Sequence, residues 1–235
     1  MPTPIVIKLG GSLLSRSEQD IFNFGYLANL KKVLEMHEFV DSKFFLAVGG
    51  GYTMRRYRDL AREAGVVSDE EIHWVGTTVN VLHAYLVKAF FYPISDEDVM
   101  KYEDYYSEAS FEISRKIKIG GGGRPGHSGD VDAILASKKL GANSVISLKN
   151  VDGVYDVDPK ISLDAKRLSK LTWDEYAKII MGKTKHEPGG NYPIDPVAAK
   201  MAAEANIKFY ILSGDDLGNF AKFLKGEAYI GTEVS

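Results

Sequence analysis

The chain has 235 residues, of which 45% are hydrophobic and 26% charged, the composition of an ordinary soluble globular protein. It has no cysteine, so disulfides, zinc fingers, Cys-ligated iron–sulfur clusters and thiol nucleophiles are excluded. Its formal net charge of −3 argues against a duplex-DNA binder, and we expect no nucleic-acid partner.

No apolar run of the sequence is long enough to span a membrane, so we expect no membrane partner. The first residues lack the basic start and the apolar stretch of a secretory signal peptide. We therefore expect a cytoplasmic protein.

Short apolar runs predict buried strands, and apolar spacing with a period near 3.6 predicts helices. In chain order the predicted elements are a strand over 4–9, a helix over 20–38, a strand over 44–48, a helix over 69–91, a strand over 117–119, a helix over 131–140, a strand over 144–148, helices over 173–181 and 195–205, a strand over 207–212 and a helix over 216–225. Ser68 and Thr172 each open a capping-box pattern. Residues 93–115 are acidic and tyrosine-rich without a clear period, which indicates either an edge excursion or an oligomer contact.

Glycine loops separate these strands from the helices, and this alternation predicts an α/β fold with a mainly parallel sheet covered on both faces. Eleven of the 23 glycines fall in four clusters, at residues 10–11, 49–51, 120–123 and 189–190. Ligands of such sheets bind beyond the carboxyl ends of the strands. Three clusters fall at those ends, so we expect them around one crevice, whereas the fourth has no role that we can assign.

The glycine clusters favour phosphate binding through backbone N–H groups, because a phosphate can approach those donors only where no Cβ intervenes. The sequence has no Walker P-loop, and its single G-x-G-x-x-G match at 121–126 lies in a glycine-rich stretch that does not open a helix at once. Lys8 and Arg55 stand beside two of the clusters and could neutralise a transferring phosphoryl group.

Each of these residues also has a plainer interpretation when it is considered alone. Lys8 could be a solvated surface charge, the triplet at 49–51 a packing site, and Asp130 a helix cap. His73 and His83 are ten residues apart on one predicted helix, about 15 Å, so they cannot share a metal ion. The phosphate-binding hypothesis therefore depends on whether Lys8, Arg55 and the glycine clusters lie together in the folded protein.

Four segments occur in the order typical of the amino acid kinase superfamily, which this chain resembles. Residues 8–12 read Lys-Leu-Gly-Gly-Ser, 48–51 read Val-Gly-Gly-Gly, 125–130 read Pro-Gly-His-Ser-Gly-Asp, and 150–159 read Asn-Val-Asp-Gly-Val-Tyr-Asp-Val-Asp-Pro. Residues 192–199 and 226–232 are similar to the tail of the archaeal-type UMP kinase branch. The resemblance covers nearly the whole chain and is weakest over 90–118.

The resemblance implies a three-layer α/β/α sandwich in a single domain, 1–235, with an acceptor-binding lobe over 1–142 and an ATP-binding lobe over 143–235. It implies an ATP-dependent, Mg²⁺-assisted kinase that phosphorylates the phosphate of a small molecule, UMP + ATP giving UDP + ADP. It also implies a homo-oligomer, commonly a hexamer.

By the same resemblance, Lys8 would neutralise charge in the transition state, Arg55 would face the transferring group, and Asp130 would orient the site directly or through Mg²⁺. The residues implied in ATP binding are Gly10, Gly11, Gly51, Lys149, Asn150, Tyr155 and Asp158. Those implied in acceptor binding are Gly50, His73, Gly123, Arg124, Pro125, Gly126, His127, Ser128 and Gly129. No residue is assigned to a metal held by the protein alone.

Departures from the branch fall mainly on the acceptor side, and they leave the acceptor open. His73 and His83 stand where UMP kinases usually have Asp and Asn, and Ser128 and Gly129 replace a Thr pair. Gly123 and Lys149 each replace a Thr. The alternatives are therefore a kinase of another phosphorylated metabolite, or a non-catalytic ATP and oxyanion (molybdenum) storage protein. The patterns of isopentenyl phosphate kinases and acetylglutamate kinases match less well.

Overall fold

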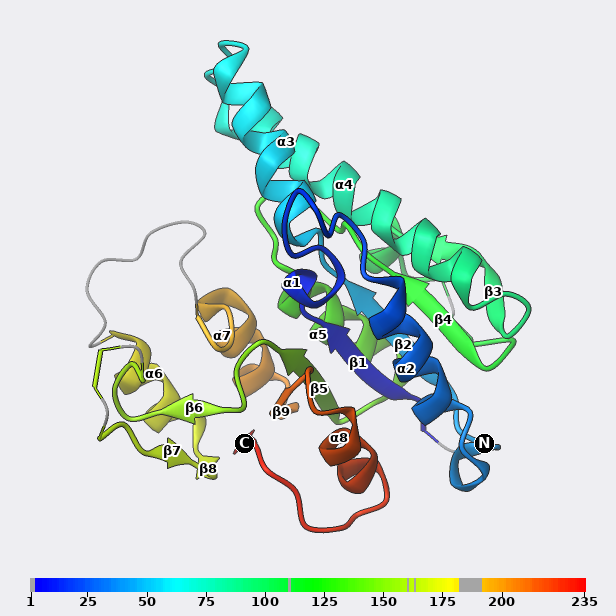
Figure 1. Ribbon diagram of the computed structural model, residues 1–235, viewed down its shortest axis with the longest axis vertical. Helices are drawn as coiled ribbons and strands as arrows, with labels where there is room; N and C mark the ends of the chain where they lie inside the picture. Colours follow the sequence, from blue (N-terminus) through cyan, green and yellow to red (C-terminus); the bar gives the residue numbers. More distant parts are fainter. Residues whose placement is uncertain (1–2, 110, 160, 163, 182–191) are drawn as a thin grey trace.

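A computed structural model describes the chain except for residues 1–2, 110, 160, 163 and 182–191 (Figure 1). Within this part an eight-stranded sheet has the order β3-β4-β2-β1-β5-β9-β10-β8. Its strands are β1 (Ile5–Leu9), β2 (Phe44–Val48), β3 (Ser95–Met100), β4 (Ile117–Gly120), β5 (Ser144–Lys149), β8 (Lys170–Leu171), β9 (Lys208–Ser213) and β10 (Thr232–Val234). Only the β9–β10 pairing is antiparallel, which confirms the mainly parallel sheet.

Alternate strand residues face opposite sides of the sheet, and each side is covered by helices. One buried cluster joins Ile7, Leu46 and Leu148 to helices α1 (Gly11–Leu14), α2 (Phe24–Leu34), α4 (Asp69–Phe90) and α8 (Leu217–Leu224). The other joins Val6, Phe45 and Val145 to helices α5 (Gly129–Leu140), α6 (Trp173–Met181) and α7 (Pro196–Glu204). The predicted three-layer sandwich is confirmed.

Helix α3 (Gly51–Glu63) lies along α4, and the two project together beyond the sheet (Figure 1). A small antiparallel pair, β6 (Val154–Tyr155) and β7 (Arg167–Leu168), lies beside α6. Within the described residues, no helix has both the length and the apolarity to cross a bilayer.

The predicted strands and most predicted helices are found close to their expected bounds, with one clear difference. The helix predicted over 20–38 is shorter, because Asn23 caps α2 by accepting the N–H of Tyr26 and Glu35 ends the helix. The short 3-10 helix that follows, His37–Phe39, supplies one more buried side chain, Phe39. The apolar spacing therefore spans two helical elements with a break between them.

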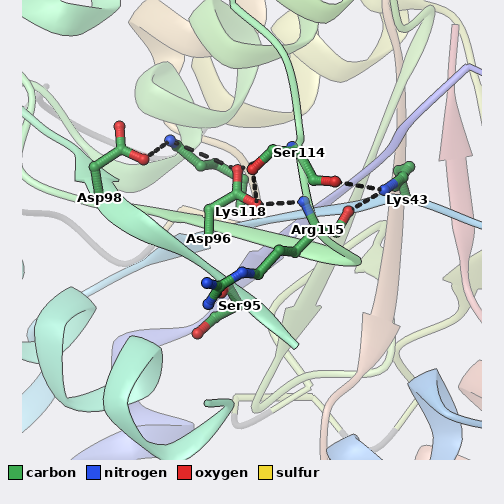
Figure 2. Close-up of polar contacts among 7 residues, drawn as sticks. All are labelled: Lys43, Ser95, Asp96, Asp98, Ser114, Arg115 and Lys118. Carbon is green, nitrogen blue, oxygen red and sulfur yellow. Dashed lines mark hydrogen bonds and ion pairs between the residues drawn. The ribbon is translucent and has the colours of Figure 1, made fainter. Parts of the chain in front are cut away.

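Residues 93–115 include the edge strand β3, which confirms the interpretation of this stretch as an edge excursion. Figure 2 shows the polar cluster that holds it. The Asp96 carboxylate, 2% exposed, accepts the backbone N–H groups of Ser114 and Arg115 at 3.2 and 2.6 Å. The buried Lys118 ammonium lies 3.7 Å from Asp96 and also pairs with Asp98. These charged contacts therefore anchor strand β3 in addition to its pairing with β4.

Candidate active site

A cleft of about 510 Å³ opens at the carboxyl ends of β1, β2 and β5. It brings together most of the predicted site residues from segments far apart in the chain. These are Lys8, Gly10, Gly11, Gly50, Gly51, Arg55, His73, Gly126, His127, Ser128, Gly129, Asp130, Lys149 and Asn150. The expectation of one crevice is therefore met by two of the three glycine clusters.

Two glycine loops interlock at the bottom of this cleft. A Cβ on Gly11 would overlap the backbone N of Gly51, and a Cβ on Gly51 would overlap the carbonyl oxygen of Gly11. Gly51 also has φ +56°, in the left-handed region that favours glycine. The two loops could not pack this closely with larger residues at Gly11 and Gly51. This packing requirement is separate from any access that the glycines give to a phosphate.

The start of α3 faces the cleft without a side-chain cap, since Gly50 occupies the N-cap. Two of its first N–H groups, those of Tyr52 and Thr53, are bound by the carbonyl and hydroxyl oxygens of Ser15. A Cβ on Gly50 would come within 2.5 Å of the Asn80 amide oxygen. The N-terminal end of α3 carries a partial positive charge, and Gly50 places no side chain in front of it. This side of the cleft therefore suits an anion.

Lys8, Asp130 and Lys149 form the charged centre of the cleft. The Lys8 ammonium lies 3.3 Å from one carboxylate oxygen of Asp130, and the Lys149 ammonium lies 3.1 Å from the other. The backbone N–H of Asp195 donates to the same carboxylate at 3.1 Å. Asp130, in the first turn of α5, therefore holds two lysines from neighbouring strands and is not merely a helix cap; Ser128 is the N-cap.

Burial by itself would raise the pKa of Asp130, but the ammonium groups of Lys149 and Lys8 and the Asp195 N–H outweigh it and hold the pKa at about 2. Burial lowers the pKa of Lys149 to about 8, although Asp130 opposes this shift. The carboxylate is thus ionised across the physiological range and fixes two cations beside the glycine loops.

Arg55, Arg58 and His73 also line the cleft. Arg58 was not predicted, although it stands three residues after Arg55 on the same helix, a spacing that places both on one face. Its Nε is buried without a hydrogen-bond partner, and its Nη1 lies 3.9 Å from the Met54 sulfur. Burial lowers the pKa of Arg58, as does the nearby Arg62. This unsatisfied donor points to an anionic ligand.

A second pocket of about 450 Å³ shares His73 with the main cleft. The rings of Trp74 and Tyr102 lie on its wall with centroids 5.9 Å apart. Three further predicted acceptor residues line this pocket and not the cleft: Gly123, Arg124 and Pro125. Arg124 is ion-paired with Glu103 and lies over the Tyr106 ring at 3.8 Å. The predicted acceptor residues therefore divide between two connected spaces.

Close packing constrains two glycines of the cluster at 120–123, and none of the four lines the main cleft. A Cβ on Gly121 would lie 2.9 Å from the Val48 carbonyl oxygen, and one on Gly122 would lie 2.5 Å from that of Thr77 in α4. The close approach of this loop to α4 and to the end of β2 thus accounts for Gly121 and Gly122, and Gly123 lines the second pocket.

Two histidines near the cleft hold loops in place. His127 Nδ1 lies 2.6 Å from the Tyr106 hydroxyl. His83 is 1% exposed, and its Nδ1 lies 3.2 Å from the Gly49 carbonyl oxygen. Burial lowers the pKa of His83, so this side chain is neutral and belongs to the core.

Two of the predicted ATP-binding residues, Tyr155 and Asp158, are not among those that line the cleft. The Tyr155 hydroxyl donates to Asp152 at 2.9 Å, and Asp152 pairs with Arg167 at 3.0 Å. A Cβ on Gly153 would meet the Thr232 hydroxyl at 2.6 Å. The motif at 150–159 is therefore built against β7 and β10, with its first residue, Asn150, in the cleft. The glycine pair at 189–190 lies outside the described residues.

Within the described residues, no group of three or more His, Asp or Glu side chains could hold a metal ion. The two carboxylates of the cleft are already engaged. Asp130 binds the two lysines, and Asp195 accepts the N–H groups of Val197 and Ala198 to cap α7. These residues do not form a metal site by themselves.

Comparison with known proteins finds a match between residues 116–213 and the family model described as amino acid kinase family. The uridylate kinase of Thermococcus kodakarensis is 32% identical, with 98% of each chain covered. That of Archaeoglobus fulgidus is 30% identical over 98% of this chain and 99% of its own. A crystal structure of the A. fulgidus enzyme aligns with a TM-score of 0.78 at 29% identity, covering 99% of this chain and 100% of that chain. A UMP kinase from Bacillus anthracis shares the fold, with a TM-score of 0.78 at 21% identity and coverage of 99% and 96%.

Proposed function

The chain belongs to the amino acid kinase family, and on that premise we propose that it catalyses UMP + ATP giving UDP + ADP. The observation that carries the proposal is the Lys8–Asp130–Lys149 centre between the interlocked glycine loops. Support comes from relatives named uridylate kinase that match over almost the full length.

The two lobes divide the substrates in this proposal. Residues 1–142 would bind the acceptor, and residues 143–235 would bind ATP. Gly10 and Gly11 would receive the ATP phosphates, next to Lys149 and Asn150. Tyr155 and Asp158 would hold the adenosine, which then has to extend from the cleft towards β6.

Transfer requires an acceptor phosphate oxygen to attack the γ-phosphorus while the bond from that phosphorus to the β–γ bridging oxygen breaks and ADP leaves. An acceptor phosphate is already ionised at neutral pH, so no general base is needed. Lys8 and Arg55 would neutralise the three equatorial oxygens, and Asp130 would keep the Lys8 ammonium in place. Gly50 and residues 126–129 would hold the acceptor on the other side.

Mg²⁺ would enter with the nucleotide, because the described residues hold no metal site of their own. Bound Mg²⁺ usually keeps several waters and takes substrate phosphates as ligands, which suits a cleft whose carboxylates are occupied. The roles given above to Lys8, Arg55 and Asp130 do not depend on it.

The direct test is ATP consumption against UMP, CMP, AMP and GMP, with Lys8→Met as the inactive control. We expect turnover with UMP that is lost in the variant. Turnover with none of the four nucleotides, from a protein that binds ATP, would overturn the nucleotide proposal. Elemental analysis of the purified protein separates a kinase from a storage protein, since the latter carries many metal atoms per chain.

A kinase of another phosphorylated metabolite is the second candidate, and the side chains around the acceptor favour it. His73 and the unpaired Arg58 face the same space, and an aromatic pocket adjoins it. An acceptor with a second anionic group would use Arg58. Screening phosphate monoesters of different charge with the same assay separates the two candidates.

We further propose that the chain forms a homo-oligomer, as a hexamer. Helix α4 supports this, because Leu82 and Tyr85 on its outer face are 54% and 42% exposed. Light scattering coupled to size-exclusion chromatography gives the mass directly. A monomer mass across micromolar concentrations would contradict the proposal.

A further inference from the structure

Lys149 lies on the same face of the sheet as Lys8. The parallel pairing of β1 with β5 places Lys8 opposite Ser147, and Lys149 follows two residues later. Because side chains alternate along a strand, Lys8, Ser147 and Lys149 all face the layer that contains α5. The backbone of Lys149 is fixed as well, since its carbonyl oxygen accepts the Gly214 N–H at 2.6 Å. The ammonium therefore reaches the cleft from a rigid strand end.

The direct ion pairs around Lys149 are uneven. Two ammonium groups, those of Lys8 and Lys149, share the single carboxylate of Asp130. Asp195, the other carboxylate near them, uses its Oδ1 to cap α7, and its negative charge raises the pKa of Lys149. Since Lys149 is 8% exposed, water stabilises its charge little, and the ammonium depends on these carboxylates.

A buried second lysine is costly as a purely structural device. One carboxylate is already paired by Lys8, so the desolvation of a further ammonium is repaid only in part. An apolar side chain of similar length would fill the same space with less cost. The arrangement becomes favourable when an anion enters the cleft beside both ammonium groups.

We propose that Lys149 is a catalytic residue that contacts the γ-phosphoryl group of ATP and neutralises its charge together with Lys8 and Arg55. This inference rests on the proposed kinase function. As the acceptor oxygen bonds to the γ-phosphorus and the bond to the β–γ bridging oxygen breaks, negative charge grows on the bridging and equatorial oxygens. The Lys149 ammonium donates hydrogen bonds to these oxygens and stays protonated, and the electron pair of the broken bond leaves with ADP.

The experiment compares the wild type with Lys149→Met and Lys149→Thr, using Lys200→Met as the matched control. Lys200 lies in α7 with its side chain 79% exposed. Steady-state kinetics with UMP give kcat, and titration calorimetry gives the affinities for ATP and for ADP separately. Thermal melting checks that each variant folds, which we expect because Asp130 keeps Lys8 as its partner.

In the Lys149 variants we expect kcat to fall about 100- to 1,000-fold, as for the loss of one preorganised transition-state donor. We expect ATP to bind about tenfold more weakly and ADP to bind as before, because only ATP has a γ-phosphate. The Lys200 variant keeps all three values.

An unchanged kcat, or an equal loss of ATP and ADP affinity, would overturn the assignment of Lys149 to the γ-phosphoryl group. If the wild type transfers to no nucleotide, the proposed acceptor is wrong, and the comparison of ATP with ADP still decides the role of Lys149.

Discussion

Asp132 shows how the loop at Gly123 is held by a buried carboxyl group. Its side chain is 2% exposed, and it accepts the Gly123 N–H at 3.3 Å through Oδ2. Its Oδ1 has no hydrogen-bond partner. Burial raises the pKa of Asp132 to about 7, although the N–H groups of Gly123 and Gly122 oppose the shift. The group therefore changes its charge close to neutral pH.

The stability of the protein should depend on pH through this residue. An unfolded Asp ionises near pH 4, whereas folded Asp132 ionises near 7, so its contribution is present below pH 4 and is lost as the pH rises through 7. Asp132→Asn should therefore unfold with less pH dependence and gain up to roughly 4 kcal/mol at pH 8. Urea unfolding at pH 5 and pH 8 measures this. An equal pH dependence in both proteins would contradict the assignment.

Arg58 offers a test of the acceptor side. If its buried Nε meets an anion of the acceptor, Arg58→Met should raise KM for the acceptor about tenfold and leave KM for ATP unchanged. Arg62→Met is the matched control, since Arg62 is on the same helix and pairs with Asp59 across exposed surface. A rise in both KM values, or in neither, would remove Arg58 from acceptor binding.

At the scale of single residues, sequence patterns predicted the cleft residues that belong to motifs, such as Lys8 and Asp130. They could not predict Arg58, because nothing in a charged helix such as α3 distinguishes a guanidinium facing a cleft from one facing solvent. Lys149 was predicted as a residue of the ATP side. Its ion pair with Asp130 depends on the pairing of β1 with β5, which local spacing does not encode.

At the scale of elements, apolar runs predicted the central strands, whose two faces are both buried. Strand β3 escaped because it is an edge strand of sequence Ser-Asp-Glu-Asp-Val-Met, and β8 and β10 escaped because they have two and three residues. Helix α3 has a largely polar sequence, so apolar spacing set no bounds for it. Short, polar or edge elements therefore gave the weakest apolar pattern in the sequence.

The charge cluster of Figure 2 predicts which contacts hold the edge strand β3. Lys118→Met would leave the buried Asp96 carboxylate without its ammonium and should cost about 3 to 5 kcal/mol. Asp98→Asn removes only the exposed partner of Lys118, 78% exposed, and should cost less than about 1 kcal/mol. Urea unfolding of both variants measures the difference. Equal losses would mean that the buried pair is not the anchor of β3.

At the scale of the whole molecule, the cleft is formed by segments from both predicted lobes. Lys8, Arg55 and Asp130 come from residues 1–142, whereas Lys149, Asn150 and Asp195 come from 143–235. The parallel order β2-β1-β5 joins the lobes through one continuous sheet, so neither lobe completes the charged centre alone. The alternation of strands and helices predicted the parallel sheet with both faces covered, and in such a sheet the carboxyl ends of the strands meet at one edge.

Binding to each lobe should stabilise the folded protein independently. ATP at about 100 times its Kd should add about 2.7 kcal/mol to the free energy of unfolding, which raises Tm by about 5 to 10 °C for a chain of this size. UMP alone should raise Tm as well, because the acceptor side of the cleft is formed without nucleotide. Differential scanning fluorimetry with ATP, with UMP and with both measures these shifts, and inorganic phosphate at the same concentration is the control. A shift with ATP and none with UMP would mean that the lobe of residues 1–142 takes another acceptor.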